Sequence, residues 1–191
     1  MRWRPAAGLP DNGPVDRTRP QADSAVRVVL LVEGHSDQIA VETLAGRLGR
    51  DLDAEGWRVV VMGGAMSVGR FAAQLAPSGL DVRGLCDVRE EPFFRRALGS
   101  YAVCDADLED ELIRALGPAA TERVLAAQGD LRRFRTFQNQ PAQRGRPEDR
   151  QLRRFIASIG GRKARYARAL VAELDLARVP PPLTQVLAEP V

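Results

Sequence analysis

The sequence predicts an α/β protein in which a parallel sheet of about four strands is flanked by helices and followed by a helical C-terminal extension. Three observations support this fold class. Short apolar runs alternate with segments of helical periodicity, and only a few residues separate them. Beyond Asp107 the periodicity is helical only. Such alternation is typical of βαβ units, so we expect a doubly wound sheet in roughly the first hundred residues.

The expected strands are short apolar segments, several of which end at an acidic residue. The first is almost continuous in Val and Leu, as in strands buried on both faces of a parallel sheet. Acids follow three of the strands directly: Glu33, Asp87 and Asp105. The four segments span residues 26–32, 57–62, 82–86 and 101–104.

Helices are expected between these strands and throughout the second half of the chain. We expect Ser36 to cap the first helix, with apolar positions from Val41 to Leu52 on one face. A last long helix is expected to follow Gly160 and Gly161, with Pro180 to Pro182 stopping it. The remaining helical segments lie near residues 67–75, 93–98, 108–116, 124–127, 131–137 and 152–159.

The expected domain organisation has three parts. Residues 1–24 are rich in Pro, Gly and charge without periodicity, which is typical of a disordered tail. Residues 25–110 form the α/β core, and residues 111–191 form a helical part that completes the domain. No apolar run approaches the roughly 20 residues of a membrane span, and the N-terminus lacks a secretory apolar segment. We therefore expect a cytoplasmic protein that does not contact membranes.

The composition excludes several classes of protein and site. With 191 residues, 45% hydrophobic and 28% charged, the chain is not a disordered polypeptide. Its two cysteines, Cys86 and Cys104, lie in apolar strands and are expected to be small buried side chains rather than a disulfide framework. The single histidine, His35, excludes a His-rich zinc site. The glycines near Gly63 lack the spacing of a P-loop or a dinucleotide-binding loop.

The charge is unevenly distributed although the net charge is only +3. Residues 105–114 carry a net charge of −4, and residues 130–168 carry +9. Among 28 basic residues the only lysine is Lys163. Arginines neutralise phosphates and supply sequence-independent affinity for nucleic acids, although a solvated Arg-rich face is an equally good interpretation. The candidates for nucleic-acid binding are Arg132, Arg133, Arg135, Arg153, Arg154, Arg162 and Arg165.

Acidic residues are expected to meet at one edge of the sheet. Ligands of open parallel sheets bind beyond the carboxyl ends of the strands, where Glu33 and Asp87 are expected to lie. Carboxylates converging there are ligands that Mg²⁺ or Mn²⁺ prefers, and without a cation they would repel one another. The alternative for acids such as Asp37 or Asp107 is that they only complement the dipole of a helix that starts beside them.

The acidic motifs resemble those of a known family. Residues 32–37, Val-Glu-Gly-His-Ser-Asp, are similar to the glutamate motif of Toprim domains, and Asp87 stands where that family has its Asp-x-Asp motif. Residues 107–109 and 161–163 resemble the acidic and lysine motifs of the OLD (overcoming lysogenization defect) branch of Toprim nucleases. The similarity extends over about residues 26–174. One departure is Arg89, which replaces the second Asp of Asp-x-Asp, and Glu90 beside it is a candidate substitute.

The resemblance implies cleavage of nucleic-acid phosphodiesters by a Toprim-type DNA endonuclease or nickase that uses Mg²⁺ or Mn²⁺, with two ions expected. Glu33 and Lys163 would be catalytic. DNA is the expected partner, with RNA as an alternative. OLD nucleases carry an ATPase domain ahead of the Toprim domain, whereas only the 24-residue tail precedes it here, so an ATPase is expected to be a separate partner or absent. The expected metal ligands are Glu33, Asp37, Asp87, Glu90, Asp107 and Glu109.

Two other functions stay open from the sequence. Because Arg89 replaces a motif carboxylate, the chain is alternatively a non-catalytic Toprim module that binds nucleic acid. The third function is that of a small regulatory α/β domain that binds a phosphorylated ligand. Metal-dependent nicking of plasmid separates the first function from both alternatives, and salt-sensitive DNA binding separates the second from the third.

Overall fold

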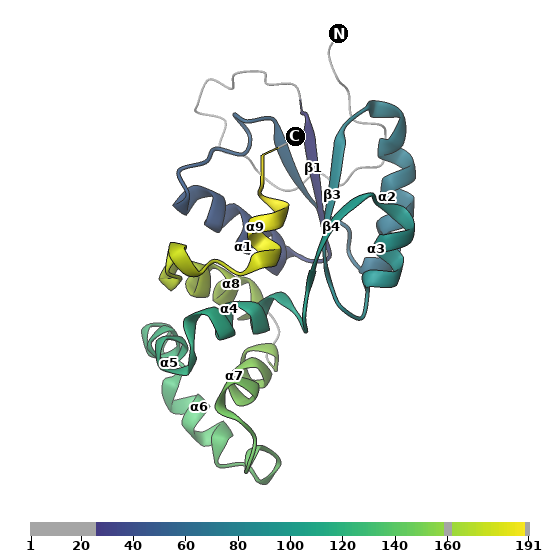
Figure 1. Ribbon diagram of the computed structural model, residues 1–191. Helices are drawn as coiled ribbons and strands as arrows, with labels where there is room; N and C mark the ends of the chain where they lie inside the picture. The colour runs from purple at the N-terminus through teal and green to yellow at the C-terminus, as the bar shows by residue number, and fades with distance from the viewer. Residues whose placement is uncertain (1–25, 159–161, 190–191) are drawn as a thin grey trace.

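A four-stranded parallel sheet forms the centre of the larger lobe (Figure 1). The computed structural model describes residues 26–158 and 162–189, so the expected tail and the Gly160–Gly161 pair lie outside the described residues. The strands pair in the order β2-β1-β3-β4, and every pairing is parallel. The predicted α/β fold class and the four strands are therefore confirmed. The strands are β1 (Val28–Val32), β2 (Trp57–Val61), β3 (Asp81–Asp87) and β4 (Ser100–Cys104).

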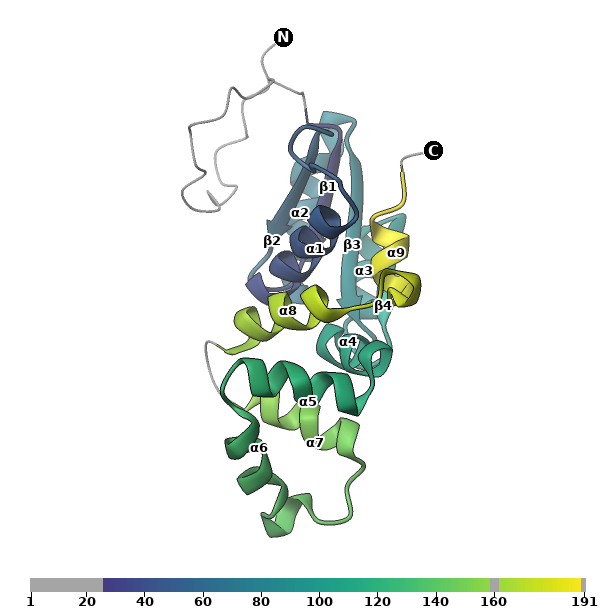
Figure 2. The ribbon, with the colours of Figure 1, turned by 90° about the vertical axis from the view of Figure 1, so that its left-hand side faces the viewer.

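Helices cover both faces of the sheet, as Figures 1 and 2 show. One face packs against α1 (His35–Arg47) and α9 (Pro181–Val186), and α8 (Arg162–Glu173) packs against α1. The opposite face packs against α2 (Val68–Leu75) and α3 (Glu91–Ala97). Leu30 and Leu31 point to opposite faces and are both fully buried, which explains the continuous apolar sequence of β1.

A smaller helical lobe lies beyond the carboxyl ends of the strands (Figures 1 and 2). It contains α5 (Pro118–Ala127), α6 (Leu131–Gln138) and α7 (Glu148–Ala157), and α4 (Leu108–Leu116) connects it to β4. Phe134, Phe137 and Phe155 pack their rings together in its centre, with centroids 5.3–6.5 Å apart. Short 3₁₀ turns occur at Ala65–Ser67, Ala76–Ser78, Pro141–Gln143 and Leu176–Arg178.

Three local predictions about helix ends are wrong. Gly34, not Ser36, is the N-cap of α1, and its N–H donates to the Asp37 carboxylate at 3.0 Å. The helix ends at Arg47, so Leu48 and Leu52 lie beyond it, because the backbone at Gly49 turns to a positive φ of 77°.

Pro180 to Pro182 begin a helix rather than stop one. The preceding helix, α8, already ends at Glu173, and α9 starts at Pro181. Proline is tolerated in a first helical turn because its missing N–H has no partner there. Leu183 and Val186 of α9 are buried in the core against the sheet.

The strand order creates a switch point at β1. The chain passes from β1 to β2 on one side and then returns to β3 on the other, so the loops after β1 and β3 leave in different directions. Ligand crevices of open α/β sheets form at such points. Along the described residues, no helix is both long and apolar enough to cross a lipid bilayer.

Candidate metal centre

A cavity of about 430 Å³ opens at the carboxyl ends of β1, β3 and β4. The loops after the strands supply most of its wall, and α1, α4 and α8 close it from the side of the helical lobe. It therefore occupies the switch point of the sheet. Its polar wall includes the six predicted metal ligands and Lys163: Glu33, Asp37, Asp87, Glu90, Asp107, Glu109 and Lys163.

Three of these carboxylates form a tight group in which one oxygen from each of Glu33, Asp87 and Glu90 lies within 4.8 Å of the others. Glu33 follows β1, and Asp87 is the last residue of β3. The chain turns after Asp87, with the Glu90 N–H donating to the Asp87 carbonyl at 2.9 Å. This turn breaks the alternation of side chains along the strand, and it brings Glu90 to the same cavity as Asp87.

Two carboxyl groups of this cluster, those of Asp87 and Glu90, hold their protons more tightly than usual. Burial, and then the charges of Glu90 and Asp107, raise the pKa of Asp87 to about 7. Burial and a hydrogen bond with Glu33 raise the pKa of Glu90 to about 7. One oxygen of Glu90, Oε2, is buried and accepts no hydrogen bond from any described residue. A divalent cation would relieve both the repulsion and the unsatisfied oxygen, so these residues fit such an ion.

A second group, next to the first, combines two acids with the only lysine. Burial raises the pKa of Asp37 to about 6 and also raises that of Glu109. Glu109 projects from α4 and is almost fully buried, and its carboxylate lies 3.5 Å from the ammonium of Lys163 on α8. Burial lowers the pKa of Lys163, but Glu109 and Asp107 more than compensate, so the net shift is upward. Lys163 is therefore a cation at neutral pH.

Asp107 also lines the cavity, but protein groups already contact both of its oxygens. Oδ1 accepts the N–H of Asp110 at 2.8 Å and so caps α4. Oδ2 accepts two guanidinium hydrogen bonds from Arg153, at 2.5 and 2.8 Å. Asp107 therefore stabilises the start of a helix, as the alternative interpretation of the sequence proposed. Ligation of a metal by Asp107 stays a prediction and would require Arg153 to release Oδ2.

Comparisons with known proteins bear on the family and the fold of the chain. Residues 26–88 match the family model described as the TOPRIM domain of overcoming lysogenization defect protein-like sequences. The chain contains an OLD-like Toprim domain. The matched residues include Glu33, Asp37 and Asp87, whereas Asp107, Glu109 and Lys163 lie beyond them.

Solved structures extend the similarity in fold to 85% of the chain. The C-terminal region of the Burkholderia pseudomallei OLD protein is 19% identical, with a TM-score of 0.62, over 85% of this chain and 95% of that one. The C-terminal region of the Xanthomonas campestris pv. campestris OLD protein, phased with iodine, is 25% identical, also with a TM-score of 0.62, over 85% of this chain and 92% of that one. No curated protein sequence matches the chain.

The arginines predicted to bind nucleic acid differ in their surroundings. Arg133 and Arg165 pair with the buried Asp130, at 3.3 and 2.5 Å, and Arg135 pairs with Glu122 at 2.6 Å. Arg132 is exposed, and the side chain of Arg162 lies outside what the structure describes. Arg153 and Arg154 line a separate cavity beside the acidic one, together with two arginines absent from the predicted set, Arg146 and Arg150. The spacing of Arg150 to Arg153 and Arg154, three and four residues along α7, could have revealed Arg150, whereas Arg146 precedes the helix.

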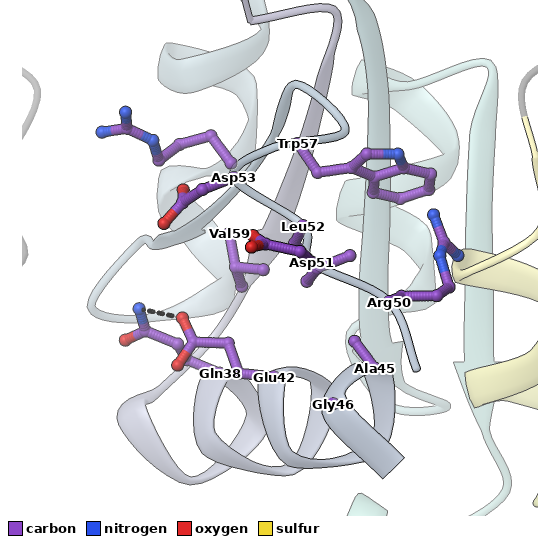
Figure 3. A pocket seen from close by; sticks show the side chains of 11 residues that line it. Gln38, Glu42, Ala45, Gly46, Arg50, Asp51, Leu52, Asp53, Trp57 and Val59 are labelled. Atoms are coloured by element: carbon purple, nitrogen blue, oxygen red, sulfur yellow. Dashed lines mark hydrogen bonds between the residues drawn. The ribbon is translucent and has the colours of Figure 1, made fainter. Parts of the chain in front are cut away.

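Another hollow, of about 440 Å³, lies between α1 and the segment that precedes β2 (Figure 3). It shares no lining residue with the acidic cavity. Arg50 on its rim is held by Glu55 and lies 4.9 Å from the centre of the Trp57 ring.

Of the acids whose positions the structure gives, Glu33, Asp87 and Glu90 are the set close enough to share a cation, so the acidic cavity is the candidate metal centre.

Proposed function

We propose that this protein is a Mg²⁺- or Mn²⁺-dependent nuclease that cleaves phosphodiester bonds of DNA in the acidic cavity, as an endonuclease or nickase. The observation that carries the proposal is the convergence of Glu33, Asp87 and Glu90 at the switch point of an OLD-like Toprim sheet. Carboxylates crowded into such a cavity are unfavourable unless a cation binds them. Phosphoryl transfer needs positive charge at this kind of site.

In this proposal, Glu33, Asp87 and Glu90 hold one ion, and Asp37, Asp107 and Glu109 are the candidates for a second. Divalent ions held there would supply the charge that stabilises the attacking and leaving oxygens of the cleaved bond.

Lys163 acts as a fixed positive charge toward the phosphate. Glu109 lies 3.5 Å from its ammonium, and the upward shift of its pKa keeps it protonated at neutral pH. It can therefore donate a hydrogen bond to a phosphoryl oxygen, but it does not serve as a base. Arg153 neutralises Asp107 at the border of the cavity and limits the negative charge that an incoming phosphate meets.

A non-catalytic nucleic-acid-binding module is the second candidate, because Arg89 replaces a motif carboxylate. Glu90 favours the enzyme, since its carboxylate lies within the group of Glu33 and Asp87. DNA as substrate, with RNA as the alternative, a separate ATPase partner and the cytoplasmic location stay predictions.

The test is incubation of the full chain with supercoiled plasmid in Mg²⁺, in Mn²⁺ and in EDTA. The proposal predicts conversion to nicked or linear plasmid with either ion and none in EDTA. Salt-sensitive plasmid binding without cleavage in all three conditions would instead support the non-catalytic module.

A further inference from the structure

A cavity lined by four arginines lies directly beside the acidic one, along α7. It has a volume of about 550 Å³, and we call it the α7 groove. Asp107 lines both cavities, so the two are contiguous. The α7 groove is lined by Asp107, Arg146, Arg150, Arg153, Arg154 and Ala157.

The guanidinium groups of the α7 groove outnumber the carboxylates near them. Arg153 binds Asp107, and Arg150 lies 3.9 Å from the buried carboxylate of Asp110. Within the described part of the chain, Arg146 and Arg154 form no ion pair. The groove therefore has positive charge available for an anionic ligand.

Part of this arrangement is already ordered before any ligand binds. Arg146 donates from Nε to the carbonyl of Ala142 at 2.8 Å, and Arg153 is held by two hydrogen bonds to Asp107. Ordering side chains in advance reduces the entropy lost on binding. Arginine presents several N–H donors in a planar fork that matches the oxygens of a phosphate.

From this geometry we propose that the α7 groove binds the phosphate backbone of the nucleic-acid strand beside the bond to be cleaved. The inference rests on the proposed function, which places the reacting phosphate in the adjoining cavity. A nucleic-acid strand carries a phosphate at every nucleotide. When one phosphate occupies the acidic cavity, the adjacent phosphates of the same strand must therefore lie outside that cavity. The α7 groove offers them cationic partners, whereas the acidic cavity itself would repel them.

The binding test uses a fluorescently labelled DNA duplex and the full chain in EDTA, so that no cleavage occurs. The variant Arg150→Ala/Arg154→Ala removes two charges from the groove. Its matched control, Arg58→Ala/Arg70→Ala, removes two exposed charges from the sheet lobe, outside both cavities. Thermal melts establish that both variants are folded.

The groove variant should bind about tenfold more weakly than wild type near 0.1 M salt. Its plot of log affinity against log salt should lose about 1.8 units of slope, for two phosphate contacts on a duplex. The control should keep the wild-type slope. Equal affinities for wild type and groove variant would overturn the proposal, as would equal losses in both variants. Displacement of DNA by polyglutamate at matching charge concentration would also overturn it, in favour of an acidic protein segment.

The same proteins in the plasmid assay separate the two proposals. If wild type nicks plasmid and the groove variant binds DNA like wild type, the groove proposal alone is wrong. If wild type binds DNA without nicking plasmid, and only the groove variant has lost DNA binding, the nuclease proposal alone is wrong.

Discussion

Lys163 sits where an ammonium fits between acidic neighbours. It extends from α8 to within 3.5 Å of Glu109, in the wall of the acidic cavity. A guanidinium is larger and planar, so Lys163→Arg should preserve the charge yet displace it from the phosphate. We expect plasmid cleavage to fall by about a hundredfold or more, the scale of losing one electrostatic group.

The matched control is Arg168→Lys, at an exposed position of the same helix. Arg165 is less suitable because it pairs with Asp130 at 2.5 Å. Cleavage by Lys163→Arg at the wild-type rate would make Lys163 an ordinary surface charge.

Asp87 should make the metal-free protein less stable as the pH rises. Its pKa is about 7 in the folded protein, against a reference value of 3.8. Between these values the folded state binds more protons than the unfolded chain, so the free energy of unfolding falls as the pH rises through this range. Because Asp87 is only half-buried, solvent limits the effect to about 1 kcal/mol, or about 2–4 °C in melting temperature.

Thermal melts in EDTA measure this effect. Asp87→Asn should melt above wild type at pH 7.5, and the difference should shrink toward pH 4. A constant difference across that range would show that titration of Asp87 does not contribute.

Glu90 is expected to replace the carboxylate that Arg89 displaces from the motif. Its Oε2 atom is buried without a hydrogen-bond partner among the described residues, and it shares a cavity with Glu33 and Asp87. Glu90→Ala should weaken Mn²⁺ binding by about tenfold or more, measured by calorimetry, because one charged ligand is lost. The neighbouring Glu91→Ala is the control, since Glu91 does not line the cavity. Equal Mn²⁺ affinities for Glu90→Ala and wild type would exclude Glu90 as a ligand.

At the scale of elements, Gly84 sets how closely α3 approaches the sheet. A Cβ atom at this position of β3 would lie 2.6 Å from the Phe94 ring and 2.8 Å from Leu98. Both neighbours are buried, so they cannot move away freely. Gly84→Ala should destabilise the fold by about 1–3 kcal/mol, measured by denaturant unfolding. Gly46→Ala, where nothing lies within 4 Å of the added methyl, is the control and should not destabilise the fold, because alanine is the better helix former in α1.

The elements that the sequence predicts best are those whose burial is uniform. β1 is buried on both faces, so its apolar run identifies it without further information. Helix ends were predicted less well because they depend on local backbone geometry, as at Gly34 and Gly49. The short helix α9 is not predicted because its prolines also fit the end of the preceding helix, and only packing against β3 and β4 fixes it as a helix.

At the scale of the whole molecule, the acidic cavity needs both halves of the chain. Glu33 and Asp87 come from strand ends, and the topology of a parallel sheet is enough to predict that they meet. The proximity of Glu109 to Lys163 depends on α8 returning from the helical lobe to pack beside α1 and α4. No local pattern encodes that return. The pairing of Asp107 with Arg153 likewise arises only when α7 folds back toward α4.

The most direct test of the central claim compares Glu33→Gln with Glu42→Gln in Mn²⁺-dependent nicking of supercoiled plasmid. Both changes remove one carboxylate charge at nearly constant shape. Glu33 lies in the cluster with Asp87, whereas Glu42 is an exposed residue of α1 outside the acidic cavity. If the acidic cavity holds the metal, Glu33→Gln should show no detectable nicking, Glu42→Gln should nick at the wild-type rate, and both should be folded. Nicking by Glu33→Gln at the wild-type rate would place the chemistry outside this cavity.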